Sequence, residues 1–221
     1  MSNLNNTSKL RIVSDYLDFE KNKPEGIYFY MDKKNIFKNY ALIIGPKNTP
    51  YFGGYYFFEV IFPTNYPDSS PKIKLLTIDG KVRFNPNLYE CGKVCLSILG
   101  TWNGPGWTNV MTLRTVLISI QSLILVEHPY FNEPGYEREI GTEHGIKRSK
   151  DYNSVIRRGT IEWAMIDMIK NPPEKYEKFV INHFKIKRNE IKDVVNTWIK
   201  EEDKEDFTDL ATKLFETLDT I

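Results

Sequence analysis

The sequence is poor in cysteine and histidine, with 2 Cys and 3 His among 221 residues. Two cysteines do not make a disulfide framework. The three histidines (His128, His144 and His183) stand at no spacing typical of zinc ligands, so we expect no metal site. An excess of positive charge is also missing, because 30 Lys and Arg face 29 Asp and Glu for a net charge of +1. A protein that coats nucleic acid normally carries a basic excess, so we expect no nucleic-acid partner.

Long hydrophobic runs are missing as well. The longest apolar stretch, residues 116–126, is interrupted by Ser119, Gln121 and Ser122. It is also shorter than the roughly 20 apolar residues that span a bilayer, so we expect no membrane partner. The first ten residues, MSNLNNTSKL, have no apolar core and do not resemble a signal peptide. Free cysteines suit a reducing compartment, and we expect a cytoplasmic or nuclear location.

Apolar side chains are plentiful, since 41% of residues are hydrophobic and 14% are aromatic, which is enough to form a sizeable core. Residues 1–7 are polar, and we expect them to be disordered. A helix is predicted from Ser8, as its N-cap, to about Lys21. Its buried face is predicted from apolar residues at helical spacing: Leu10, Val13 and Leu17.

Four strand-like segments follow, at residues 27–31, 37–44, 55–62 and 72–76. Turns rich in Gly, Pro, Asn and Asp separate them. Because such short loops cannot make parallel crossovers, the pattern predicts an antiparallel meander.

The second half of the chain is irregular and then helical. Residues 77–110 lack periodicity, and a long irregular segment in a compact domain is often functional. Residues 112–126 read as a helix that is apolar nearly all round and therefore buried. A helical extension is predicted for 149–221, with an apolar stripe that we interpret as core: Trp163, Ile166 and Ile169. Strands in one block and helices in others predict an α+β fold.

Cys95 is the first candidate for chemistry. It lies four residues after Cys91, in a stretch punctuated by Gly and Pro. A lone cysteine is most often a small buried apolar residue. Loops on a rigid scaffold tend to carry function, however, which favours a nucleophile at Cys95.

Asn87, in the turn Asn85-Pro86-Asn87, is the second candidate. An Asn amide offers two N–H donors, which suit a developing oxyanion. Pro86 fixes its own φ and so restricts its neighbours. From spacing alone, a simple Asn-Pro-Asn turn remains the alternative.

Three stretches resemble the catalytic domain of ubiquitin-conjugating enzymes: PYFGGYYFFEVIFPTNYPDSSPKIKLLT, FNPNLYECGKVCLSILGTW and LISIQSLILVEHPYFNEP. The resemblance runs from about Gly26 to Tyr136. Within the family, the FNPN and GKVCLSILGTW strings and the NEPG segment resemble the corresponding strings of the subgroup that comprises enzyme Z and its relatives. The resemblance implies an N-terminal helix, a four-stranded antiparallel meander, a cysteine loop and a central helix. It places the catalytic domain at 8–148 and a helical extension at 149–221.

The resemblance also implies roles for particular residues. Cys95 would accept the C-terminal carboxylate of ubiquitin, or of a ubiquitin-like modifier, as a thioester from an activating enzyme. Asn87 would stabilise the oxyanion or order the loop, and Glu133 would position or deprotonate the attacking lysine. Asn85 stands where the family usually has His. Further positions follow by the same comparison, as motif support (Asn85, Pro86, Trp102) or as contacts with the activating enzyme or a ligase (Lys9, Arg11, Tyr66, Pro67, Asp68, Pro105). No cofactor is implied, since ATP is used only by the activating enzyme.

Two departures concern ligase binding. Asp68 stands where many members have an apolar residue that packs into RING-type ligases, and a carboxylate resists burial there. The loop containing Trp102 and Trp107 is also longer than usual. We interpret these indoles as a lid over the site, with partner contact as the alternative.

Two other functions stay open from the sequence. An inert family member could act as a binding scaffold in the ubiquitin pathway, although Cys95 lies in an intact motif. A cysteine hydrolase would need a histidine close to Cys95, for which His128 is the nearest candidate.

Overall fold

The computed structural model describes residues 2–78 and 80–221. Its contacts divide the chain into two compact units. The first comprises Met1–Ile43 and Tyr56–Leu125, and the second comprises Ile44–Tyr55 and Val126–Ile221. The boundary expected between residues 148 and 149 stays a prediction. No helix in the described ranges has the length and apolar character that a membrane span needs.

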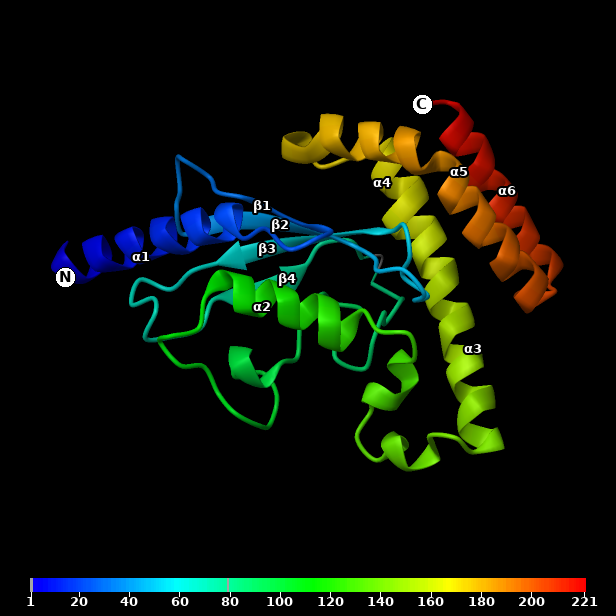
Figure 1. Ribbon diagram of the computed structural model, residues 1–221, viewed down its shortest axis with the longest axis horizontal. Coiled ribbons are helices and arrows are strands. Elements are labelled where there is room, and N and C mark those ends of the chain that lie inside the picture. Colours follow the sequence, from blue (N-terminus) through cyan, green and yellow to red (C-terminus); the bar gives the residue numbers. More distant parts are fainter. Residues whose placement is uncertain (1, 79) are drawn as a thin grey trace. The chain divides into compact units, whose positions relative to one another are not determined.

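The first unit is built on a four-stranded sheet of order β1-β2-β3-β4 (Figure 1). The strands are β1 (Ile27–Tyr30), β2 (Lys38–Ile44), β3 (Tyr55–Ile61) and β4 (Lys72–Leu75). Pairing is antiparallel, with Ile27 opposite Ile43 and Phe58 opposite Leu75. Both of these pairs are buried, as alternation along the strands requires when one face covers a core. The predicted meander and the α+β class are confirmed.

Helix α1 runs from Ser2 to Lys21, so its predicted end is confirmed and its predicted start is wrong. Ser2–Thr7 are helical rather than disordered, while Met1 lies outside the described residues. Ser8 is no N-cap, because its hydroxyl donates to the Thr64 carbonyl (2.7 Å) from inside the helix.

The predicted buried face of α1 is also wrong. Leu10 and Leu17 are 70% and 61% exposed. The buried side chains recur at a different helical phase: Ser8, Ile12, Asp15 and Phe19. Two polar residues on this face bond inside the unit, so apolar spacing alone selected the wrong face.

Helix α2 (Leu113–Ser119) follows Thr112, whose hydroxyl caps it by accepting from the Thr115 N–H. A wider π-type turn, Ile120–Ile124, continues the helix. The sequence predicts a helix over 112–126 that is buried nearly all round. This burial is confirmed for one side only, since Ile118 and Leu123 are 37% and 57% exposed.

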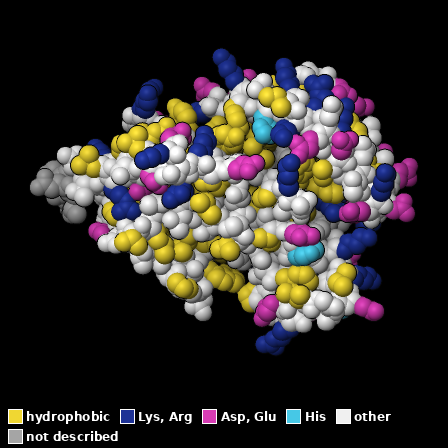
Figure 2. All heavy atoms as spheres, viewed as in Figure 1, with side chains coloured by type: hydrophobic (Ala, Val, Ile, Leu, Met, Phe, Trp, Pro, Cys, Tyr) yellow, Lys and Arg dark blue, Asp and Glu magenta, His cyan; other side chains and the backbone are white. Residues whose placement is uncertain are grey.

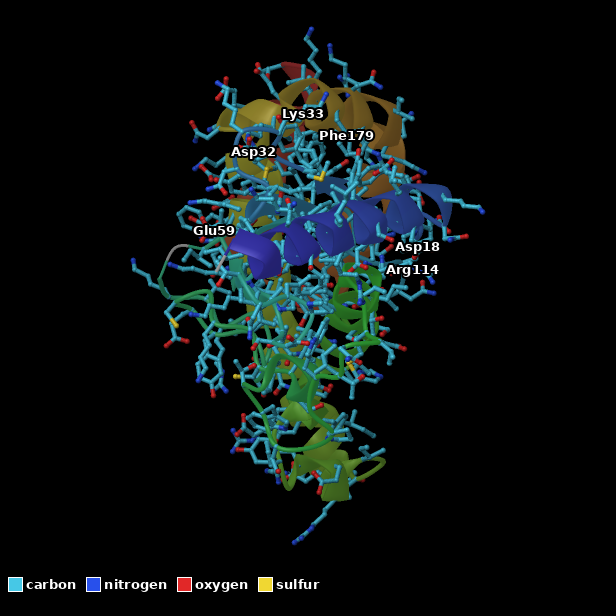
Figure 3. The ribbon with its side chains drawn as sticks, turned by 90° about the vertical axis from the view of Figure 1, so that its left-hand side faces the viewer. Asp18, Asp32, Lys33, Glu59, Arg114 and Phe179 are labelled. Carbon is cyan, nitrogen blue, oxygen red and sulfur yellow. The ribbon has the colours of Figure 1, made fainter. Side chains whose placement is uncertain are left out.

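Asp15 joins α1 to α2. Its buried carboxylate accepts from the Arg11 Nε (2.7 Å), the Leu113 backbone N–H (3.1 Å) and the Tyr66 hydroxyl. The negative charge of Asp15, beside the first residue of α2, also interacts favourably with the positive end of the helix dipole. Burial, together with the bond to Asp15, raises the pKa of Tyr66 above its ordinary value. A second contact between the helices, Asp18 with Arg114 (3.3 Å), lies half-exposed at the surface (Figure 3).

The second unit is mainly helical, as predicted for the tail. Helices α5 (Glu177–Glu202) and α6 (Glu205–Asp219) lie side by side (Figure 1). Ile166 and Ile169, of the stripe predicted as core, are buried. The elements are three short 3-10 turns (Pro129–Asn132, Tyr136–Glu139, Glu174–Tyr176), α3 (Glu143–Gly159), a π-type segment (Thr160–Asp167), α4 (Met168–Lys170), α5 (Glu177–Glu202) and α6 (Glu205–Asp219).

Residues 44–55, which connect β2 to β3, pack against these helices. The Thr160 hydroxyl donates to the Pro50 carbonyl (3.0 Å). A Cβ on Gly54 would lie 2.8 Å from the Thr160 methyl, so glycine permits the close approach. The Tyr55 ring contacts Phe184 and His183, with ring centroids 4.7 and 5.4 Å apart.

Replacing Asp15 tests the joint between α1 and α2. We expect Asp15→Ala to lower the free energy of unfolding by about 3 kcal/mol or more, because it leaves the Arg11 and Tyr66 donors without their buried acceptor. Asp18→Ala removes an exposed carboxylate from the same helix and should cost less than about 1 kcal/mol. Urea unfolding of both variants measures the difference, and equal losses would contradict the role of Asp15.

His183 makes stability depend on pH. Burial, with a smaller contribution from Lys187, lowers its pKa below the ordinary 6.5. The unfolded chain therefore binds the proton more readily than the folded chain, so stability should fall as the pH drops below about 6.5. His183→Phe keeps an aromatic ring beside Tyr55 and should remove this component. Thermal unfolding between about pH 5 and pH 8 compares the two proteins. Parallel profiles would refute the role of His183.

Candidate active site

Cys95 and Asn87 lie opposite each other in a tight hairpin. The Cys95 N–H donates to the Asn87 carbonyl (2.8 Å), and the Tyr89 N–H donates to the Lys93 carbonyl (3.0 Å). Between these bonds, Leu88 pairs with Val94 as an antiparallel bridge. The hairpin thus brings together two residues that the sequence proposed separately.

The hairpin has a core face and an outer face. Leu88 and Val94 are buried, at 0% and 1% exposure. Because side chains alternate along extended backbone, the remaining members share the other face: Asn87, Tyr89, Lys93 and Cys95.

The Cys95 thiol is covered. Cys95 is 1% exposed, whereas Cys91 in the turn is exposed. Neighbouring groups therefore close over the sulfur, although Lys93 on the same face is exposed to solvent. The sequence did not indicate that this thiol is covered.

Thr101 clamps the backbone on both sides of Cys95. Its hydroxyl donates to the Val94 carbonyl (2.7 Å) and accepts from the Leu96 N–H (3.0 Å). The peptide groups that flank the thiol are thus fixed by one side chain. Sequence reasoning missed Thr101, because its spacing from Cys95 does not reveal that the chain turns back after the 3-10 turn Ser97–Leu99.

The Asn85 side chain holds the Asn85-Pro86-Asn87 turn in place through two hydrogen bonds. It is fully buried, its amide donates to the Ile124 carbonyl (2.8 Å), and its Oδ1 accepts from the Asn87 N–H (2.7 Å). The side chain therefore ties the site to the end of the central helix. Pro86, also buried, stands between the two asparagines.

The Asn87 side chain is less tightly held. Its Oδ1 is buried and has no hydrogen-bond partner among the described residues. A buried amide oxygen without a partner is costly and rare, so its presence here needs an explanation. The Asn87 backbone N–H is thus fixed by Asn85, while its side-chain oxygen is left as an unused acceptor.

Gly92 shapes the hairpin turn. Its φ is 85°, a left-handed value that favours glycine. Its carbonyl accepts from the Leu75 N–H (2.9 Å), and a Cβ would lie 2.3 Å from the Leu75 carbonyl oxygen. The hairpin can therefore lie against β4 only with glycine at this position.

The two loops predicted to bind partners are tied together. The Trp107 Nε1 donates to the Pro67 carbonyl (2.6 Å), and its ring lies 5.9 Å from that of Tyr66. Trp107 thus packs on the Tyr66-Pro67 loop. Tyr66 is only 1% exposed in the free chain, and its predicted partner contact stays a prediction. The predicted positions that remain accessible are Asp68, Trp102 and Pro105.

Lys9 and Arg11 differ in accessibility. Lys9 is exposed. Arg11 is engaged by Asp15 and by the carbonyls of Asn109 (2.8 Å) and Met111 (2.6 Å), so it serves the fold. Glu133 belongs to the second unit, where its backbone N–H donates to Tyr130 (3.3 Å), and its role at the lysine gate stays a prediction.

Within the described ranges, no group of three or more His, Cys, Asp or Glu side chains is placed to hold a metal ion. The fold and the hairpin define an α+β protein with a buried cysteine whose backbone N–H bonds to an asparagine carbonyl. A family model described as "Ubiquitin-conjugating enzyme" matches residues 11–160. The chain belongs to the ubiquitin-conjugating enzyme family.

Relatives carry similar names. The chain is 43% identical over 222 residues to the "Probable ubiquitin-conjugating enzyme E2 R521" of Acanthamoeba polyphaga mimivirus, a match that covers 95% of this chain and 15% of that protein. It is 49% identical over 164 residues to the human "Dual E2 ubiquitin-conjugating enzyme/E3 ubiquitin-protein ligase BIRC6", covering 72% of this chain and 3% of that protein. It is 47% identical over 161 residues to human "Ubiquitin-conjugating enzyme E2 Z", covering 72% and 44%. The chain therefore spans less than half of each of these relatives.

Alanine at Gly92 tests the contact with β4. We expect Gly92→Ala to lose clearly more stability than Gly100→Ala, by about 1 kcal/mol or more. Both glycines have positive φ (85° and 67°), but a Cβ on Gly100 would meet nothing within 4 Å. The left-handed backbone conformation should cost about 1–2 kcal/mol in both variants. The difference between Gly92→Ala and Gly100→Ala therefore measures the clash with Leu75. Urea unfolding gives both values, and equal losses would contradict the clash.

Proposed function

We propose that the chain accepts ubiquitin, or a ubiquitin-like modifier, from an activating enzyme as a thioester on Cys95. It then transfers the modifier to a lysine amine of a substrate or to a ligase. The observation that carries this proposal is the hairpin bond between Cys95 and Asn87 (2.8 Å), in a chain that belongs to this family.

The first step is an exchange of thioesters. The Cys95 thiolate attacks the carbonyl carbon of the modifier's C-terminal glycyl thioester on the activating enzyme. The new S–C bond forms as the old one breaks, and the departing thiolate takes up the proton that Cys95 lost. No free-energy source is consumed, since one thioester replaces another.

The second step is aminolysis. A lysine amine attacks the same carbonyl, an N–C bond forms, and the C–S bond breaks to return Cys95 as a thiolate. The amine attacks only when neutral, and a lysine with an ordinary pKa near 10.4 is mostly protonated at pH 7. Glu133 is the residue we propose to take or orient that proton. The Asn87 amide would donate to the carbonyl oxygen as negative charge develops on it.

The remaining assignments follow from this chemistry. Neither step uses a cofactor, and ATP is consumed by the activating enzyme upstream. A thiol that must stay reduced suits the cytoplasm or nucleus. We place partner contacts at Lys9, Pro67, Asp68 and Pro105, which leaves Arg11 and Tyr66 as supports for that surface.

A charging assay tests the proposal. We expect the chain to form an adduct with ubiquitin in the presence of activating enzyme and ATP, stable on a non-reducing gel and lost with thiol. Cys95→Ala should abolish the adduct, and Cys91→Ala, at an exposed turn position, should leave it intact.

A second variant separates the two steps. Asn87→Ala should still charge but should discharge onto free lysine about a hundredfold more slowly, as expected for the loss of an oxyanion donor. Absence of any adduct with several activating enzymes and modifiers, for protein shown to be folded, would rule out the proposed function.

A further inference from the structure

Two lysines face each other beside the site. Lys74 on β4 pairs with Lys93 of the hairpin in an antiparallel bridge. The bridge is held by the adjacent bond from the Leu75 N–H to the Gly92 carbonyl (2.9 Å). Like charges directly opposite each other across a sheet are destabilising. The arrangement therefore favours a negatively charged group between or above the two ammonium groups.

No carboxylate of the chain fills that role among the described residues. No Asp or Glu in the described ranges comes within 4.0 Å of the Lys74 or Lys93 ammonium. Glu59 on β3, labelled in Figure 3, pairs with Lys74 on β4, but its carboxylate is bound by Lys38 (2.7 Å). Lys72 is a further exposed cation on the same face of β4.

The lysines lie on the side of the hairpin that carries the nucleophile. Alternation puts Lys93 on the face of Cys95, two residues away, while Val94 between them is buried. The Lys93 ammonium lies over the Tyr89 ring (5.6 Å), which agrees with a shared face. The Arg83 guanidinium lies over the same ring (4.2 Å) and adds positive charge there. The exposed lysines Lys72, Lys74 and Lys93 are called the cationic face below, while the Arg83 guanidinium beside them also donates to the Pro86 carbonyl.

We propose that the cationic face binds an acidic segment of the polypeptide that presents the acceptor lysine, and so makes acidic sequence next to that lysine a determinant of substrate choice. The inference rests on the proposed function and specifies its substrate class. A peptide fits better than nucleic acid, because the whole chain has a net charge of only +1. Both signs of charge are also interspersed over the face of the molecule in Figure 2.

The test compares two fluorescent peptides. In one, a central lysine is flanked by Glu and Asp, and in the other by Gln and Asn. The charged wild-type protein should transfer ubiquitin to the acidic peptide about fivefold faster at 50 mM salt, and the advantage should shrink at 500 mM because salt screens exposed charges. In Lys74→Gln/Lys93→Gln, the ratio of the two rates, each normalised to discharge onto free lysine, should fall to about one.

Matched variants control for net charge and fold. Lys170→Gln/Lys200→Gln removes two exposed lysines of the second unit and should keep the preference. Lys74→Arg/Lys93→Arg should retain most of it. A wild-type rate ratio of one, or a preference that survives Lys74→Gln/Lys93→Gln, would overturn the inference.

Binding by the uncharged protein separates this inference from the proposed function. Fluorescence anisotropy should show tighter binding of the acidic peptide by wild type than by Lys74→Gln/Lys93→Gln. If no thioester forms, the proposed function fails, while this measurement still decides whether the cationic face binds acidic sequence. Equal anisotropy with both peptides, or tighter binding of a single-stranded RNA of equal charge, would overturn the proposal.

Discussion

The backbone bond between the Cys95 N–H and the Asn87 carbonyl is the contact on which the site depends. It sets the register of the hairpin, and the register decides which side chains accompany the thiol. The Thr101 hydroxyl bonds the peptide groups on either side of Cys95, and the Asn85 Oδ1 accepts from the Asn87 N–H. Paired backbone fixes the point from which the Cys95 side chain extends, and fixed orientation is a large part of what favours a reaction between two bound groups. The same register puts Lys93 beside Cys95 and opposite Lys74.

A second set of buried polar contacts organises the surface around the site. The Asp15 carboxylate accepts hydrogen bonds from α1, from the Tyr66 loop and from the start of α2. Since each donor would be costly to bury alone, the carboxylate holds three segments in one arrangement. Trp107 then ties its own loop to Pro67. Arg11 and Tyr66, which are expected to touch partners, also make contacts within this unit in the free chain, and Asp68 and Pro105 are exposed.

The second unit has its own buried polar anchor. Glu202, at the end of α5, accepts from the Ser154 hydroxyl and pairs with Arg157 (3.1 Å), whose guanidinium lies over the Trp198 ring (5.3 Å). Glu190 binds Lys47 (2.8 Å) and Lys187 (2.7 Å), and these cations lower its pKa to about 2. Lys47 belongs to the 44–55 connection, so the helical tail and the segment between β2 and β3 form one packed body. The tail therefore packs against the 44–55 connection within the second unit.

The sequence by itself determined the four strands, the central helix, the helical tail and the identity of the thiol, because period-2 alternation, turn residues and a specific motif are local signals. It misjudged α1, where burial follows the partners of Ser8 and Asp15 instead of the apolar stripe of Leu10 and Leu17. Only the tertiary structure decided that Cys95 is covered, that Thr101 clamps it, and that Lys74 meets Lys93. Each of these features depends on contacts between residues that come together only when the chain folds back on itself. Neither composition nor spacing shows which backbone groups will pair in the folded chain.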